Sequence, residues 1–203
     1  MPAQTDTIAD LRRTLVELSH RAYALGLVPG VSGNLSVRVP GEDRVLIKAT
    51  GFSLGDMTPA HTLLVDLDGR VLEGTDLRPS KEMFFHLAIY RRRPEVGAVV
   101  HLHPPYTTAF AAVHQLPPAL TGAARAFLGG KVALVPPAPS GSRELAAMVE
   151  AAFRDPEIRA AVLAEHGSIT VGPDLYSAFY LSQYLEDAAR TALLVRILRG
   201  PQD

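Results

Sequence analysis

The sequence predicts an α/β fold with a mainly antiparallel sheet. Up to Leu72, short apolar strands are joined by tight-turn sequences, Gly41-Glu42-Asp43 and Asp68-Gly69, which are typical of hairpins. Segments with apolar residues at steps of three and four, which predict helices, occur at the start, in the middle and at the end of the chain. The 16 glycines and 16 prolines imply many loops and argue against a simple helical bundle.

The composition limits the function before any motif is considered. A chain of 203 residues fits one domain, residues 1–203, with a substantial core. The net charge of −1 gives no basic surface for nucleic acid, so no nucleic-acid partner is expected. Cysteine is absent, which excludes disulfides and leaves histidine, carboxylate or water as metal ligands. No secretory signal or membrane-spanning run is visible, so we expect a cytoplasmic protein without a membrane partner.

The first part of the chain predicts one helix followed by antiparallel strands. The helix covers Ile8–Leu25, with Thr5 or Asp6 as its cap and Gly26 as its end. A glycine-rich turn over residues 30–34 leads into a short strand that reaches Arg38. The remaining predicted elements are a strand at Arg44–Ile47, a helical turn at Asp56–Pro59, and strands at Leu63–Leu67 and Val71–Leu72.

The second part predicts strands that alternate with helices. Ser80 is expected to cap a helix opened by residues 78–82, and Ser142 another. Tyr176, Tyr180 and Tyr184 recur every four residues, which predicts a stripe of packed side chains that could lie at a subunit contact. The other predicted elements are strands at Val99–Leu102, Lys131–Val135, Ala161–Ala164 and Ile169–Val171, and helices at Pro105–Val113 and from Asp174 to about Arg199.

One strand ends in the segment Val99-Val100-His101-Leu102-His103-Pro104. Side chains alternate faces along a strand, so His101 and His103 point the same way about 7 Å apart, which suits two imidazoles on one metal ion. His166 follows another strand, next to Gly167. Three neutral histidines leave an open position on a tetrahedral metal, as in catalytic zinc sites. The alternative is that the three histidines are unrelated and structural.

Glu82 offers one free carboxylate for the same site. It could be a fourth ligand that substrate displaces and that then acts as a base. A carboxylate in the first turn of a helix is also favourable through the helix dipole alone, so this residue has a second, structural explanation. His86, one turn further along the same face, is expected to pack or to support the site.

Six segments, taken together and in this order, resemble the class II aldolase and adducin-head family. The resemblance covers Leu25 to Gly200. The segments are Ser32-Gly33-Asn34-Leu35-Ser36, Thr50-Gly51 before Met57-Thr58-Pro59, Val65-Asp66-Leu67-Asp68-Gly69, Pro79-Ser80-Lys81-Glu82, Val100-His101-Leu102-His103-Pro104 and Glu165-His166-Gly167.

The resemblance implies a three-layer α/β/α sandwich and a metal-dependent enzyme. It implies a divalent metal on His101, His103 and His166, usually Zn²⁺, with Mn²⁺, Co²⁺ or Fe²⁺ also acceptable to such ligands. It assigns Glu82 to metal binding and proton transfer. It implies a homotetramer with the active site between subunits. The segments that it implies for substrate phosphate contain Ser32, Gly33, Asn34, Thr50, Gly51 and Ser80. Lys81 departs from the family's pattern, and its ammonium group could pair with the phosphate or with a substrate carboxylate, or face solvent.

The predicted activity is a carbon–carbon lyase that cleaves a small phosphorylated ketose such as L-fuculose 1-phosphate through a metal-bound enediolate. Two departures from the family's aldolases favour an alternative, decarboxylation of a 3-oxo-tetronate 4-phosphate. Lys81 replaces a serine, and the stretch Leu120–Ala123 lacks the tyrosine that protonates the leaving group in those aldolases. Epimerisation fits less well, because the C-terminal extension of the epimerases is missing. A non-catalytic binding module of the adducin type is a third possibility.

Overall fold

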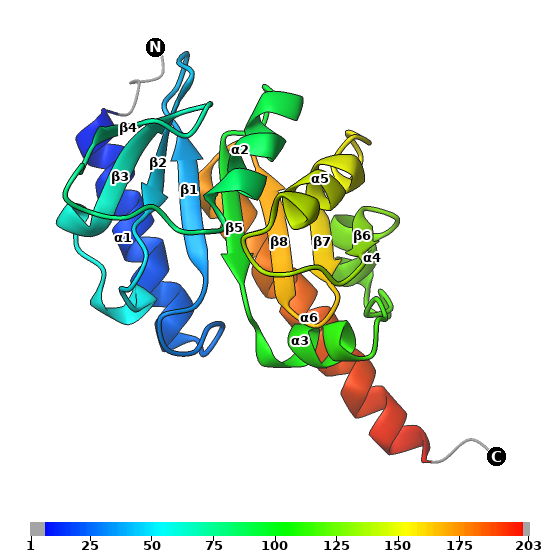
Figure 1. The fold of residues 1–203 in the computed structure, drawn as a ribbon. Helices are drawn as coiled ribbons and strands as arrows, with labels where there is room; N and C mark the ends of the chain where they lie inside the picture. The colour runs from blue at the N-terminus through cyan, green and yellow to red at the C-terminus, as the bar shows by residue number, and fades with distance from the viewer. Residues whose placement is uncertain (1–6, 201–203) are drawn as a thin grey trace, which may run out of the picture.

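The computed structural model describes residues 7–200, which form one eight-stranded sheet with helices on both faces. The strand order is β4-β3-β2-β1-β5-β8-β7-β6 (Figure 1). Only the pairing of β6 with β7 is parallel, so the prediction of a mainly antiparallel sheet is confirmed. The strands are β1 (Asn34–Arg38), β2 (Arg44–Lys48), β3 (Thr62–Asp66), β4 (Val71–Glu73), β5 (Ala98–Leu102), β6 (Val132–Val135), β7 (Ala160–Leu163) and β8 (Gly167–Gly172).

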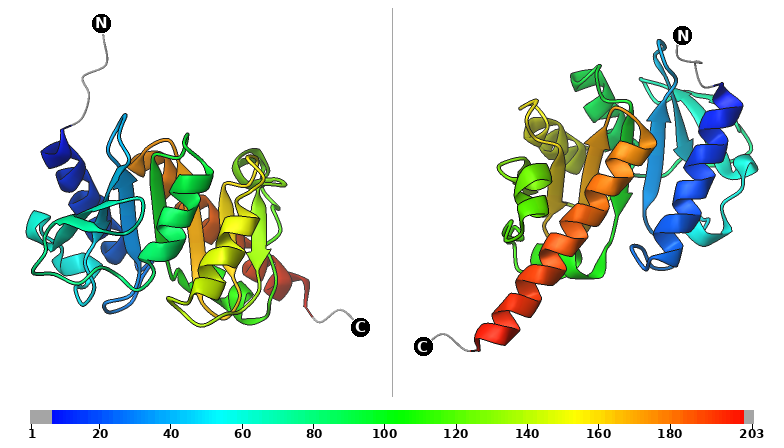
Figure 2. Two further views of the ribbon diagram at one scale, coloured as in Figure 1. Left: turned by 45° about the horizontal axis from the view of Figure 1, so that its top comes forward. Right: turned by 180° about the vertical axis from the view of Figure 1, so that it is seen from behind.

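The helices divide between the two faces of the sheet. Helices α2 and α5 cover one face, and the longer α1 and α6 cover the other, as the front and back views show (Figures 1 and 2). The short α3 and α4 pack against α6. The α-helices are α1 (Ile8–Ala24), α2 (Met83–Arg92), α3 (Pro105–Ala112), α4 (Gly122–Leu128), α5 (Arg143–Ala152) and α6 (Leu175–Arg199), with 3-10 turns at Leu54–Asp56 and Pro59–His61.

The sheet is buried on both faces except along its outermost strands β4 and β6. Val45, Ile47 and Val99 point toward α2 and α5, whereas Leu46 and Val100 point toward α1 and α6. Such alternation follows from the strand period of two. No described helix is long and apolar enough to cross a membrane.

Three local predictions differ from the structure. Helix α1 is capped by Thr7, whose side chain accepts from the backbone N–H of Asp10; the expected caps, residues 5 and 6, lie outside the described part of the chain. The helical turn expected at Asp56–Pro59 is two 3-10 turns on either side of an extended Met57-Thr58 pair. Helix α4 was not predicted at all.

The start of α2 is also shifted. Ser80 was expected to cap a helix that began near it, but α2 begins at Met83 and the hydroxyl of Ser80 accepts from the backbone N–H of Glu82 instead (3.2 Å). Glu82 thus stands at the helix N-cap rather than inside the first turn. This placement leaves the carboxylate free to point away from the helix, toward the end of β5.

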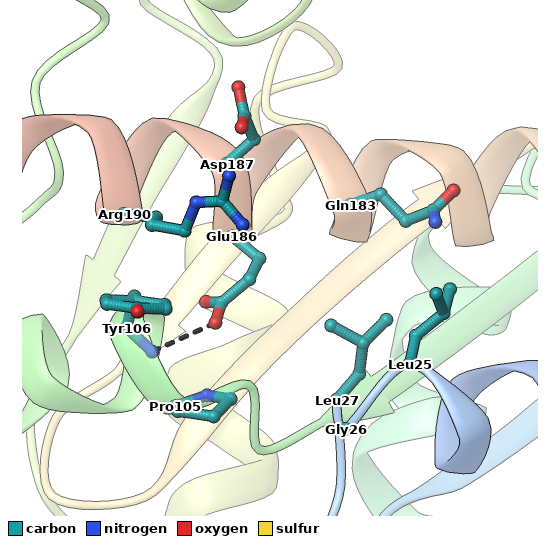
Figure 3. A pocket seen from close by; sticks show the side chains of 9 residues that line it. All are labelled: Leu25, Gly26, Leu27, Pro105, Tyr106, Gln183, Glu186, Asp187 and Arg190. Carbon is teal, nitrogen blue, oxygen red and sulfur yellow. Dashed lines mark hydrogen bonds between the residues drawn. The ribbon is translucent and has the colours of Figure 1, made fainter.

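A buried carboxylate ties α3 to α6 just after the His-x-His strand. Glu186 of α6 accepts from the backbone N–H groups of Tyr106 and Thr107 at 2.9 and 2.7 Å, beside a cavity of about 240 Å³ (Figure 3). These N–H groups belong to the first turn of α3, where an acceptor satisfies orphan donors and the helix dipole. The contact fixes the chain immediately after His103-Pro104.

Candidate metal centre

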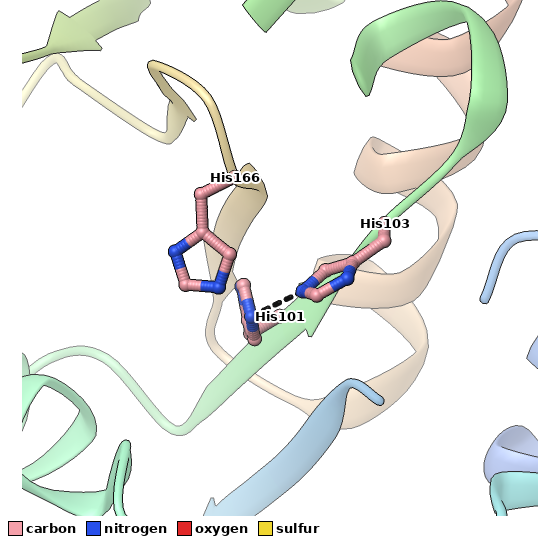
Figure 4. Close-up of side chains that lie close together, drawn as sticks. All are labelled: His101, His103 and His166. Carbon is pink, nitrogen blue, oxygen red and sulfur yellow. Dashed lines mark hydrogen bonds between the residues drawn. The ribbon is translucent and has the colours of Figure 1, made fainter. Parts of the chain in front are cut away.

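The predicted histidines converge at one edge of the sheet. Because β5 and β7 are each antiparallel to β8, they run in the same direction and end at the same edge. His101 is the last residue but one of β5, His103 directly follows that strand, and His166 lies in the turn after β7 (Figure 4). Their candidate ligand nitrogens all lie within 4.8 Å of one another. His101 is fully buried and the other two are partly exposed, so the cluster is reached from one side.

The hydrogen bonds fix which nitrogen of His101 faces the cluster. The Nδ1–H of His101 donates to the backbone oxygen of Ser168 at 2.9 Å, since a carbonyl oxygen can only accept. In the neutral ring the lone pair of His101 is therefore on Nε2, which lies 3.0 Å from Nε2 of His103. Burial, together with the neighbouring His101 and His166, lowers the pKa of His103 to about 3. His103 is thus neutral at pH 7, as a metal ligand must be.

Glu82 lies on the other side of the same cluster. Its Oε2 is 3.2 Å from Nε2 of His101 and its Oε1 is 3.0 Å from Nε2 of His166. Burial opposes the charge of this carboxyl group, but the close contacts with His101, His166 and Ser140 outweigh burial and hold its pKa far below the usual range. The carboxylate is only 6% exposed and is ionised at neutral pH.

This donor set fits a divalent cation. Lone pairs of imidazole nitrogens and of a buried carboxylate face one another at about hydrogen-bond distance, and a bound cation would satisfy them together. The backbone contact of His101 is the kind of outer contact that orients a ligating imidazole. Phe85 adds an apolar wall, with its ring edge-on to that of His101 at 5.3 Å between centroids.

Two glycines allow the strands to come this close. Gly33 adopts φ = +70°, and a Cβ there would lie 2.8 Å from a methyl carbon of Val28 and 3.1 Å from the backbone oxygen of His101. At Gly167 a Cβ would lie 2.6 Å from the backbone oxygen of Leu102 and 2.7 Å from the ring of His103. Both positions therefore exclude larger residues next to the cluster.

The three segments expected to hold phosphate lie together beside the histidines. Asn34 donates from Nδ2 to the hydroxyl of Ser80 (3.3 Å), which joins the first segment to the third. The backbone N–H of Thr50 donates to the backbone oxygen of Arg78 (3.0 Å), which joins the second to the third. Ser32 is partly exposed, and Thr50, Gly51 and Lys81 are exposed. The stem of Lys81 lies against Gly141.

Sequence reasoning missed two polar residues at this site, Lys48 and Ser140. Lys48 ends β2 and is only 2% exposed; burial lowers its pKa to about 8 although nearby Glu82 opposes the shift. Its Nζ donates to the backbone oxygen of Val31 at 3.3 Å. A lysine at the end of an otherwise apolar strand, two residues before Thr50-Gly51, was a usable signal.

Ser140 lies in the loop between β6 and α5, and its hydroxyl donates to Oε1 of Glu82 at 2.6 Å. No motif marked it, because only the end of β6 beside β7 brings this loop to the site. Residues 137–140 and 164–166 line a cavity of about 400 Å³ that reaches His166. A cavity of this size accommodates a small phosphorylated substrate.

The fold and the histidine cluster together define a family of enzymes. Residues 13–193 match the Class II Aldolase and Adducin N-terminal domain family. The chain therefore belongs to this family and is an enzyme of the class II aldolase type, as the motifs predicted.

Relatives with two different activities are similar to the chain. It is 36% identical over 185 residues to the 3-oxo-tetronate 4-phosphate decarboxylase of Haemophilus influenzae, covering 88% of this chain and 85% of the relative. It is 32% identical over 191 residues to the L-fuculose phosphate aldolase of Escherichia coli K12, covering 94% and 86%. The crystal structure of L-fuculose-1-phosphate aldolase from Thermus thermophilus superimposes with a TM-score of 0.82 at 30% identity, covering 97% and 100%.

Proposed function

We propose that this protein is a metal-dependent carbon–carbon lyase that cleaves a small phosphorylated ketose such as L-fuculose 1-phosphate. The observation that carries the proposal is the convergence of His101, His103 and His166 on an ionised Glu82. The three histidines would hold the metal, which is zinc or another divalent ion such as Mn²⁺ or Co²⁺. When bound, such a metal supplies Lewis-acid stabilisation of negative charge on substrate oxygens.

Glu82 is the residue to which we assign proton transfer. Cleavage leaves the electrons of the broken carbon–carbon bond on the carbon beside the carbonyl, which must gain a proton, while the hydroxyl that becomes the aldehyde oxygen must lose one. An ionised Glu82 can take up the hydroxyl proton and pass it to that carbon. Glu82 is the carboxylate within 3.2 Å of the histidine nitrogens, so it stands where substrate would meet the metal. Asn34 and Ser140 hold its two oxygens at 2.9 and 2.6 Å, which supports a fixed orientation for this step.

The phosphate end of the substrate has a candidate site beside the metal ligands. Ser32, Gly33, Thr50, Gly51 and Ser80 belong to segments that the fold brings together, and Lys48 supplies a buried cation next to them. A cation in a nearly dry environment attracts a phosphate strongly. The direct test is incubation of the zinc-loaded protein with L-fuculose 1-phosphate, where release of a hydroxyaldehyde is expected.

Decarboxylation of a 3-oxo-tetronate 4-phosphate is the second candidate. Two observations favour it: no tyrosine occurs in residues 116–124 to take the proton from the hydroxyl that becomes the aldehyde, and the exposed Lys81 precedes Glu82. Loss of carbon dioxide from an ionised carboxylate needs no such proton transfer, and a lysine ammonium pairs well with a substrate carboxylate. Release of CO₂ from this substrate, without hydroxyaldehyde from L-fuculose 1-phosphate, would select this activity.

A binding role of the adducin type makes the opposite prediction about metal. Purified protein without divalent metal, whose melting temperature does not respond to zinc, would remove the enzyme proposal in both forms.

Sugar phosphates are charged and do not cross membranes unaided, so we also propose that the enzyme is cytoplasmic.

We further propose a homotetramer with the active site at the subunit interface. The support is a set of exposed apolar side chains on the last turns of α6, which extend beyond the sheet (Figure 2). Ile197 is 66% and Leu198 is 85% exposed, which is unusual for such residues unless a partner covers them. Light scattering should give four times the chain mass; a monomer would contradict this part of the proposal.

A further inference from the structure

A line of buried polar side chains lies behind Glu82, away from the histidine cluster. Glu82, the N-cap of α2, is followed at steps of four residues by His86 and Tyr90 within α2, and all three are buried. Helix α2 covers one face of the sheet (Figure 1). Asn34 and Ser36 recur every two residues on β1 and point toward that helix, because their cross-strand partners His101 and Val99 do. Four residues advance along a helix by about the same length as two residues along a strand, so the five side chains face one another.

The hydrogen bonds along this line run in one direction. The hydroxyl of Tyr90 lies 2.9 Å from that of Ser36, which lies 2.7 Å from Nδ1 of His86. Nε2 of His86 lies 2.5 Å from Oδ1 of Asn34, and Nδ2 of Asn34 lies 2.9 Å from Oε2 of Glu82.

The carboxylate at the end of the line determines every donor behind it. An ionised carboxylate only accepts, so Asn34 must present its NH₂ group to Glu82 and its carbonyl oxygen to His86. That oxygen also only accepts, so His86 must carry its proton on Nε2. Nδ1 of His86 then accepts from Ser36.

We propose that His86 is a positioning residue for the lyase reaction: its Nε2–H fixes the amide of Asn34 so that the NH₂ group holds Glu82 in place for proton transfer. This inference rests on the proposed acid–base role of Glu82. His86 is completely buried, and among the described residues its ring nitrogens bond to Ser36 and Asn34 and to none of the three histidines, so its effect passes through Asn34. Without the donor, the amide oxygen of Asn34 has lost its partner, and the amide is no longer held in the orientation that presents its NH₂ group to Glu82.

Two polar variants of His86 separate positioning from packing. In His86→Gln the amide nitrogen reaches the place of Nε2 and still donates to Asn34, whereas in His86→Asn the shorter side chain reaches only the place of Nδ1. We expect His86→Gln to keep kcat within about threefold of the wild type. We expect His86→Asn to lose about 10- to 100-fold in kcat, with KM and zinc content little changed. Equal losses in both variants would overturn the proposal.

A double-mutant comparison tests whether the effect passes through Asn34. If it does, adding His86→Asn to Asn34→Ala changes kcat by less than about twofold. Multiplied losses would instead show that His86 acts elsewhere.

Should His86→Asn fail to fold, Ser36→Ala can replace it as the test, because it removes the hydroxyl that donates to Nδ1 of His86. Ser36→Ala should lower kcat, whereas Tyr90→Phe should change kcat less than about twofold. Equal effects of the two would count against the proposal.

The activity assays use L-fuculose 1-phosphate and a 3-oxo-tetronate 4-phosphate. If the wild type cleaves neither, the proposed function fails, and the position of Asn34 is still testable by NMR of zinc-free protein labelled with ¹⁵N-asparagine. The Asn34 NH₂ signals, assigned by their loss in Asn34→Ala, should stay in place in His86→Gln and move in His86→Asn. Unmoved signals in both variants would refute the orientation argument.

Discussion

The neutrality of His86 makes a prediction about stability and pH. Burial lowers the pKa of His86 to about 3, because the imidazolium form would lose its hydration in a fully buried position. In the unfolded chain its pKa is about 6.5. Between these values the unfolded state binds more protons than the folded state, so stability falls as the pH falls below about 6.5. Above about pH 6.5 His86 is neutral in both states and no longer lowers the stability of the folded protein.

The size of the effect follows from the two pKa values. Between pH 8 and pH 5, His86 should cost the folded state about 2 kcal/mol. His103, whose pKa is also lowered to about 3, contributes a similar loss in metal-free protein, so the wild type alone cannot separate them. In His86→Gln only the His103 contribution remains. The difference between the two proteins isolates His86.

The assay is urea denaturation in the presence of a chelator, at pH 5, 6, 7 and 8 and at one protein concentration. For a slope of about 2–3 kcal/mol/M, the wild-type midpoint should fall by roughly 0.7–1 M more than that of His86→Gln between pH 8 and pH 5. Parallel profiles would refute the reasoning. They would mean that His86 gains a proton in the folded state as readily as in the unfolded chain, so that below about pH 6.5 its Nδ1 would be protonated and could not accept from Ser36.

The remaining predictions concern the metal centre. His103→Ala should abolish zinc uptake measured by elemental analysis, whereas His20→Ala, on α1 and bonded to Met57, should retain it. Zinc at about 1,000 times its Kd should stabilise the protein by about 4 kcal/mol, which raises the Tm by about 8–16 °C, and a chelator should reverse this; an unchanged Tm counts against the site. Gly167→Ala should cost about 1–3 kcal/mol in urea unfolding and weaken zinc binding, because the added Cβ meets Leu102 and His103. Gly122→Ala, with open space around it, should do neither.

Most of the sheet could be predicted from the sequence because its strands are marked locally. Alternation and tight turns place β1 to β4 within a residue or two of their observed ends. Helix α4 was missed because it has only seven residues and little periodicity of its own. Tertiary contacts stabilise it: Ala124 and Leu128 are buried, and Phe127 stacks on Tyr184 of α6 at 4.1 Å.

The histidine cluster was predictable for a different reason from the rest of the site. His101 lies in β5 and His103 directly follows that strand two residues later, so local geometry alone places them together. Lys48 and Ser140 lie 34 and 58 residues from Glu82 in the sequence, and only the pairing of the strands brings them near it. The predicted start of α2 was wrong for the same reason: Ser80 bonds to Asn34 of a distant strand.

The structure gives Asn34 a different role from the one that its sequence motif predicts. The sequence motif groups it with residues expected to bind phosphate, but its side chain has two N–H donors and one acceptor oxygen. The NH₂ group donates to Ser80 and Glu82, and the oxygen accepts from Nε2 of His86. No donor of this amide remains for a phosphate while these contacts hold. The cation beside it, Lys48, is therefore the stronger candidate for phosphate, and Asn34 belongs with the acid–base group at the other end of the substrate.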